Sequence, residues 1–249
     1  VGYTRDTFVG LEKYREVFQD PVFRKAFINT VEYTLWSIVI GFGIPIGLAL
    51  LLSEVIHGKT FFRTAIYFPN IVPGLATVLM WTFLMDPAPG GVLNSILANF
   101  GIGPKPWLND PKAVIPLIVL TMTWKGAGAT ALIYLAVIQG IDDTYYEAAR
   151  MEGANLWQRL RYVTIPHLLP TIRMLFILQI ISVFQVFYEP LVMTGGGPDN
   201  ASISLLQLIY SYVFKYGDAA KGAAVGVIVA LFLMLLTFVY LRVSKIDER

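Results

Sequence analysis

Hydrophobic residues gather in long segments of this chain, and shorter polar stretches separate them. The segments cover about residues 31–53, 64–85, 113–138, 171–194 and 222–244. A helix needs roughly 20 apolar residues to cross the hydrocarbon core of a membrane. No charged residue lies between Tyr33 and Ser53 or between Thr64 and Met85, so a water-soluble core does not explain these segments. We therefore expect an all-α polytopic membrane helical bundle with about five spans.

The overall composition supports a membrane location. Hydrophobic residues make up 56% of the 249 residues and charged residues 14%, and the mean hydropathy is +0.62. The absence of cysteine excludes disulfides, thiolate metal sites and cysteine nucleophiles. A formal net charge of +2 is too small to suggest nucleic acid as a partner.

Glycine and proline weaken the first two apolar segments. They occur at Gly41, Gly43, Pro45 and Gly47 in the first segment and at Pro69, Pro73 and Gly74 in the second. Broken helices persist in lipid where neighbouring helices or a water-filled cavity satisfy the freed backbone groups. Such breaks fit a transport pathway, although packing kinks are commoner. The spacings Gly43-x-x-x-Gly47 and Gly222-x-x-x-Gly226 predict close helix contacts.

The chain shows no linker that would divide it, so residues 1–249 are interpreted as a single transmembrane domain. The distribution of basic residues between the polar segments leaves its orientation undecided. Because the chain starts at Val1 and no signal-like segment precedes the first span, we expect an internal fragment that lacks an upstream span. The intact protein would then have about six spans and two cytoplasmic ends.

The polar stretch of about residues 140–170 predicts two short helices. Asp142 or Asp143 can cap the first, and Gly153 suits the left-handed residue that ends it. Asn155 with Gln158 matches a capping box that opens a second helix. We expect this second helix to run from Leu156 to about Thr164 and to end near Pro166.

Small side chains give the first of these helices a distinctive surface. Ala148 and Ala149 lie beside Glu147, on a face that Tyr145 also approaches. This surface, with one charge and room for close approach, suits insertion into a groove on a cytoplasmic partner. An ordinary amphipathic loop is the alternative.

One motif in this stretch resembles a known family. Glu147, Ala148, Ala149, Gly153, Ile165 and Pro166 match the signature cytoplasmic loop of permease subunits of bacterial ATP-binding-cassette importers. Glu152 stands where that family usually has Asp. The resemblance implies that this loop couples the spans to an ATPase.

Other segments resemble the carbohydrate-uptake branch of that family, the maltose-type and glycerol-phosphate-type permeases. Near the N-terminus they are Phe8-Val9-Gly10-Leu11, Tyr14, Asp20-Pro21 and Asn29-Thr30. Near the C-terminus they are Thr194-Gly195-Gly196-Gly197-Pro198, Tyr210 and Phe214-Lys215-Tyr216. The resemblance covers nearly the whole chain and implies a sugar importer.

The family implies a division of labour among several proteins. A second permease subunit, related but different, would complete the pathway, and an ATPase dimer would bind the cytoplasmic loops. An extracytoplasmic solute-binding protein would deliver the sugar, and membrane lipid would surround the spans. This chain would carry no cofactor, and ATP and Mg would bind to the partner ATPase.

Ionisable and amide side chains within the spans are candidates for solute contact. Lys125 lies near mid-membrane in the third apolar segment, where pairing with Trp124 offers a structural alternative. Gln179, Gln185, Tyr188 and Glu189 could bind sugar, because hydroxyl groups pair with amides and carboxylates while aromatic faces accept a sugar ring.

Enzymatic activity is not expected of this chain. Gly58-Lys59-Thr60 is similar to the end of a phosphate-binding loop, but Ser53 stands where its first glycine belongs. The two histidines, His57 and His167, lie several spans apart, which argues against a metal or a catalytic site. A stand-alone secondary transporter or channel is the main alternative to the importer permease. A membrane-embedded enzyme is the third function considered.

Overall fold

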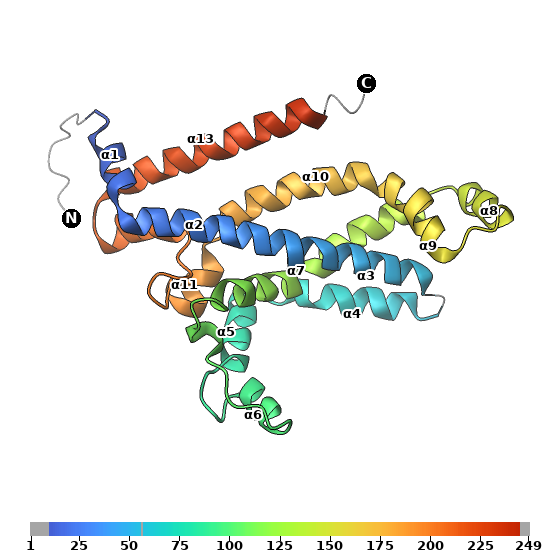
Figure 1. Cartoon of the computed structure of the whole chain (residues 1–249), viewed down its shortest axis with the longest axis horizontal. Coiled ribbons are helices and arrows are strands. Elements are labelled where there is room, and N and C mark those ends of the chain that lie inside the picture. The colour runs from blue at the N-terminus through green and yellow to red at the C-terminus, as the bar shows by residue number, and fades with distance from the viewer. Residues whose placement is uncertain (1–9, 56, 245–249) are drawn as a thin grey trace.

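The computed structural model describes residues 10–55 and 57–244, and it is helical without strands in these ranges (Figure 1). Its helices are α1 (Glu12–Gln19), α2 (Pro21–Trp36), α3 (Gly43–Glu54), α4 (Lys59–Ile71), α5 (Gly74–Leu84), α6 (Val92–Ala98), α7 (Val114–Gln139), α8 (Asp143–Met151), α9 (Leu156–Arg159), α10 (Ile165–Phe184), α11 (Tyr188–Thr194), α12 (Leu205–Tyr210) and α13 (Ala219–Ser244). Three π-helical segments, η1 (Ser37–Phe42), η3 (Leu160–Thr164) and η4 (Ser211–Lys215), and the 3-10 turn η2 (Trp107–Asn109) join them. Phe8 and Val9, part of the resemblance, lie outside the described residues.

The expected number of spans is confirmed for the described residues. Four helices are long and apolar enough to cross a membrane, namely Pro21–Glu54, Val114–Gln139, Leu156–Phe184 and Ala219–Arg242. A fifth candidate is the pair α4 and α5, which passes the same test together but bends by 92° at its break.

The first span begins ten residues earlier than about residue 31, since it starts at Pro21. The Asp20 side chain accepts a hydrogen bond from the Val22 N–H at 2.8 Å, and Pro21 occupies the first helical position, where its missing N–H has no effect. The helix stays continuous past Pro45 because η1 precedes it, and a π-helical turn widens the backbone there.

The second span is broken, as its prolines suggested. Val72 has an extended backbone before Pro73, which disfavours a helical conformation in the residue ahead of it. The carbonyl groups freed at this break face Lys125, whose Nζ donates to Val72 O at 2.5 Å and lies 3.5 Å from Asn70 O. Lys125 therefore stabilises the broken span from α7, a structural role different from the expected pairing with Trp124, whose ring lies 5.9 Å from the Trp81 ring.

The expected segment 171–194 is not one helix. α10 continues from α9 through η3, so the second loop helix does not end near Pro166 but merges into the span. Pro166 is tolerated because it lies in the first turn of α10, directly after the widened η3. The span ends at Phe184. Two residues later, the carbonyl group of Val186 accepts a hydrogen bond from Ser204 Oγ at 2.6 Å in place of the N–H of a further helical turn.

α7 lies in the middle of the bundle, where it packs against α2, α3, α4 and α10. Its closest approach is at Gly128, where an added Cβ would lie 1.9 Å from Ile66 O of α4. At Gly222 an added Cβ would lie 2.5 Å from Val213 Cγ2, which agrees with the predicted close contact there. Gly43 and Gly47 make no such contact among the described residues of this chain, since an added Cβ would meet nothing within 4 Å at either position.

The two ends of the bundle differ. α8 and α9 lie at the same end as the last turn of α3 and the first turn of α4, whereas α1 and α11 lie at the opposite end (Figure 1). This arrangement places the polar loop at one membrane face, away from the start of the first span.

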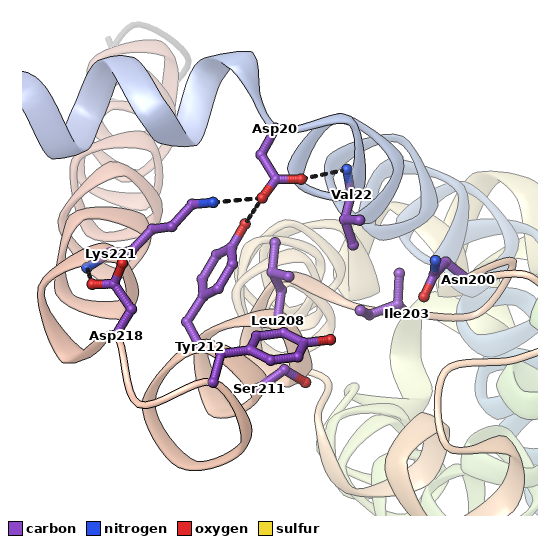
Figure 2. Close-up of a pocket in the computed structure, with 10 residues that line it drawn as sticks. Asp20, Val22, Asn200, Ile203, Leu208, Ser211, Tyr212, Asp218 and Lys221 are labelled. Carbon is purple, nitrogen blue, oxygen red and sulfur yellow. Dashed lines mark hydrogen bonds and ion pairs between the residues drawn. The ribbon is translucent and has the colours of Figure 1, made fainter.

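At the end of the bundle that carries α1, a cluster of charged side chains joins α1 and α2 to the start of α13 (Figure 2). Asp20, between α1 and α2, accepts hydrogen bonds from Tyr212 Oη at 2.5 Å and from Lys221 Nζ at 2.6 Å. The Lys221 ammonium also lies 4.5 Å from the centre of the Tyr212 ring. Lys13 reaches Asp218 at 3.3 Å, so both α1 and α2 are tied to the start of α13.

Replacing Asp20 with Asn should destabilise the folded protein at neutral pH. It should also make the stability of the protein depend less on pH in the acid range. Burial raises the pKa of Asp20, but hydrogen bonds from Lys221, Tyr212 and the Val22 N–H outweigh burial and hold that pKa below its ordinary value. A carboxylate with a lowered folded-state pKa stabilises the fold above its unfolded pKa, and this contribution disappears as the pH falls through the folded value.

The measurement is the thermal midpoint of detergent-purified protein between pH 7 and pH ~3, just below the ordinary aspartate pKa of about 3.9. We expect the wild-type midpoint to fall more steeply than the midpoint of the variant in the acid range. Equal midpoints for the two proteins at pH 7 would contradict a stabilising role for this cluster.

Candidate functional site

The first helix of the polar loop forms as its sequence predicts. The Asp142 side chain caps α8 and accepts the Thr144 N–H at 2.9 Å, and this hydrogen bond lowers the pKa of Asp142. At the other end Gly153 has φ +77°, and the Ala154 N–H bonds back to Ala149 O at 2.9 Å. The chain therefore reverses at a left-handed residue, as glycine allows.

The second helix opens with the predicted capping box. The Gln158 N–H donates to Asn155 Oδ1 at 2.9 Å, and the Asn155 N–H donates to Gln158 Oε1 at 2.8 Å. Since α9 continues into α10 without a break, movement of this part of the loop would be transmitted directly to a membrane span.

α8 is attached to the base of α10 by two aromatic side chains. The Tyr146 hydroxyl lies 3.0 Å from Thr164 Oγ1, and the Tyr145 ring lies 5.2 Å from the His167 ring. No residue of α8 is fully buried. The helix thus projects from the bundle as a surface element (Figure 1).

The loop presents an open groove of about 460 Å³. It is lined by Tyr145, Ala148, Ala149, Glu152, Gly153, Ala154, Gln158, Tyr162 and Val163. Beside it, Glu147 is exposed, and Met151 and Trp157 are 90% and 69% exposed. Exposed large apolar side chains around small ones are typical of a protein contact surface.

The remaining motif residues lie where α9 joins the span. Ile165 packs against the core that Ala49, Tyr134 and Leu168 form, while Pro166 is exposed. Among the motif residues, Ile165 therefore anchors the loop, whereas the residues from Glu147 to Gly153 form its free surface.

A second polar feature lies between the spans. Gln179 Nε2 donates to Ser37 Oγ at 2.5 Å, beside a cavity of about 170 Å³. Its lining comes from α7, α10 and the first span, and its polar side chains are Ser37, Thr123, Thr130, Gln179 and Ser182. An added Cβ at Gly41 would lie 3.2 Å from both Gln179 Nε2 and Thr123 Oγ1, so the glycine keeps this cavity open.

The other predicted solute contacts do not line this cavity. Gln185 is exposed just beyond α10, and Glu189 is half-buried in the first turn of α11. Tyr188 packs beside the core that contains Tyr33 and Val186, and Lys125 supports the broken span. The structure therefore separates Gln179 from the other four candidates.

Most of the polar lining of the cavity was not predicted from the sequence. Ser37, Thr123, Thr130 and Ser182 are small hydroxyl residues within apolar helices, which are common in such helices and hydrogen-bond to their own backbone. The only sequence signal was the cluster of glycine and proline near Gly41 and Pro45.

Known proteins similar to this chain are membrane components of transport systems. The family described as "Binding-protein-dependent transport system inner membrane component" matches residues 24–246. The probable ABC transporter permease protein YurN of Bacillus subtilis is 33% identical, over 96% of this chain and 84% of its own length. The trehalose/maltose transport system permease protein MalF of Thermococcus litoralis is 32% identical, over 96% of this chain and 80% of its own length.

A solved structure shares the fold. It is a bacterial alginate ABC transporter in complex with an alginate pentasaccharide-bound periplasmic protein. The matching chain has a TM-score of 0.90 at 24% identity, over 97% of this chain and 85% of its own length.

Proposed function

Because this chain belongs to the family of binding-protein-dependent transport system inner membrane components, we propose that it forms part of the translocation pathway of an ATP-driven sugar importer. It is a multi-pass protein of the inner membrane. Its relatives are permease subunits, so ATP hydrolysis is assigned to a partner subunit.

The observation that carries this proposal is the two-helix loop, whose second helix is continuous with a membrane span. An ATPase that holds the groove around Ala148 and Ala149 would displace α8 and α9 when its dimer closes. The movement would pass into α10 as a rigid body, because helices packed in a bundle shift between discrete arrangements. In this mechanism Glu147 and Glu152 supply the charges of the contact, and Gly153 sets the angle between the two helices.

Sugar is the proposed solute because one of these relatives is named as a trehalose/maltose transport permease and because the cavity chemistry suits hydroxyl groups. Gln179 offers both a donor and an acceptor, and the neighbouring hydroxyls offer the same. Gln185, Tyr188 and Glu189 would contact the solute nearer the end of the bundle that carries α11.

The proposed assembly contains a second, related permease and an ATPase dimer. A solute-binding protein would bind at the end of the bundle formed by α1 and α11. The alginate transporter, a neighbour in fold, is seen in complex with a periplasmic protein, which supports a solute-binding protein as a partner.

Uptake by membrane vesicles tests the proposed function. Vesicles that contain the full-length protein and its genomic neighbours receive labelled maltose or trehalose with a matching binding protein. Accumulation should require enclosed ATP and should persist when ion gradients are collapsed. Accumulation driven by an ion gradient without ATP would instead identify a stand-alone secondary transporter.

Gln179→Leu should weaken solute binding within the membrane and leave assembly intact. The variant keeps the side-chain size but removes the donor that reaches Ser37 and the cavity, and one lost hydrogen bond of about 1.4 kcal/mol corresponds to a tenfold change. We expect the KM of ATP-driven uptake to rise about tenfold at a normal protein level. Leu178→Ala, at an exposed neighbour outside the cavity, serves as the control, and an unchanged KM in Gln179→Leu would exclude solute contact there.

A further inference from the structure

A second polar cavity, of about 290 Å³, lies under the two-helix loop and takes no part in the proposed transport mechanism. We call it the basal cavity. It is lined by Ser53, Glu54, Lys59, Ile138, Gln139, Asp143, Tyr146, Arg150, Leu156, Arg159, Leu160 and Thr164. These residues come from the ends of α3 and α7, the start of α4, the loop helices α8 and α9, and the π-helical segment η3.

The basal cavity lies at the depth of the lipid head groups. Glu54 is the last residue of the span Pro21–Glu54, and Gln139 is the last residue of the span Val114–Gln139. Two spans thus end at its wall, where the hydrocarbon core gives way to the polar layer of the membrane.

Three cations line the basal cavity, of which Lys59 and Arg150 are exposed and Arg159 is partly buried. In the part of the chain that the structure describes, Lys59, Arg150 and Arg159 make no salt bridge, and their side chains make no hydrogen bond. The Nε of Arg159 is buried and also lacks an acceptor among the described residues. Buried donors are normally satisfied, so this one indicates an acceptor that is not part of the chain.

The chemistry of the lining points to a phosphate group. Arginine presents a planar fork of donors that matches phosphate oxygens, and basic pockets between spans at a membrane face bind lipid head groups. Glu54 and Asp143 also line the basal cavity, so the three cations exceed the carboxylates by one positive charge. That excess balances the single negative charge of a phosphodiester better than the higher charge of free phosphate.

We propose that the basal cavity binds the phosphodiester of a phospholipid head group through Lys59, Arg150 and Arg159. The bound lipid bridges α8, which carries Arg150, to the start of α4, which carries Lys59. α8 is otherwise attached through Tyr145 and Tyr146. The lipid therefore holds the two-helix loop against the membrane-embedded bundle.

The test uses the full-length protein with its co-purifying subunits, delipidated in detergent and titrated with phosphatidylglycerol. Native mass spectrometry measures retained lipid, and hydrogen exchange measures the protection of residues 143–151. The double variant Lys59→Gln/Arg159→Gln should bind the lipid about fivefold more weakly for each cation removed, with matching loss of protection. Arg161→Gln is the control, because Arg161 is an exposed cation on the same segment that lies over the Tyr162 ring and outside the basal cavity.

Two further arms identify the ligand. Diacylglycerol, which lacks the phosphate, should give no protection, and millimolar inorganic phosphate should give less than phosphatidylglycerol. Equal protection by inorganic phosphate would overturn the lipid assignment in favour of a soluble phosphate. Equal retention of phosphatidylglycerol by the wild type and by a double variant with an unchanged thermal midpoint would overturn the site itself.

Discussion

Gly128→Ala should sharply reduce the amount of folded protein in the membrane. The added Cβ would lie 1.9 Å from Ile66 O and 2.6 Å from its carbonyl carbon, so the backbones of α4 and α7 would have to separate. Backbone atoms cannot turn away as a flexible side chain can, and overpacking of this kind costs about 1–3 kcal/mol or more. We expect loss of the monodisperse peak in fluorescence-detected size exclusion and a lower thermal midpoint.

Gly126→Ala provides the matched control on the same helix. An added Cβ at Gly126 would meet nothing within 4 Å, and alanine favours helix formation over glycine. This variant should keep the wild-type profile. Equal behaviour of the two variants would mean that α4 does not pack against α7 at Gly128.

Gly153→Val should abolish ATP-driven uptake without reducing the amount of protein in the membrane. Gly153 has φ +77°, and a β-branched residue in this conformation is strained by about 1–2 kcal/mol. An added Cβ there would meet no atom within 4 Å, so the effect would come from the backbone rather than from crowding. The turn would change direction and move α8 away from its position on α9.

Gly140→Ala controls for replacing a glycine in the same loop. Gly140 has φ −89°, and an added Cβ would lie 3.5 Å from the nearest atom, which is ordinary contact. Uptake by membrane vesicles and the protein level by immunoblot are measured for both variants. Normal uptake by Gly153→Val would show that the geometry of this turn is not needed for coupling.

The two-helix loop was predictable because its signals are local. Asp142, Gly153 and the pair Asn155 and Gln158 act through backbone groups a few residues away, and each makes the expected contact. The number of spans was predictable for a similar reason, since membrane insertion depends on the apolar length of each segment.

The features that the sequence did not predict depend on contacts between segments that lie far apart in the chain. The end of α10 at Phe184 is stabilised by Ser204, and the role of Lys125 depends on a break in another span. The lining around Gln179 is completed by hydroxyl residues of two other spans, which no local pattern brings together. The sequence therefore suggested Gln179 as a solute contact but grouped it with Gln185, Tyr188 and Glu189, which do not line the cavity around Gln179.

The most direct test of coupling is affinity purification of the full-length protein from its native membrane in mild detergent, followed by an ATPase assay of the eluate. Wild type and Gly140→Ala should co-purify with an ATPase, and Gly153→Val should lose most of it at an equal amount of permease. Transport-competent protein without ATPase in any eluate would contradict the assignment as an importer permease.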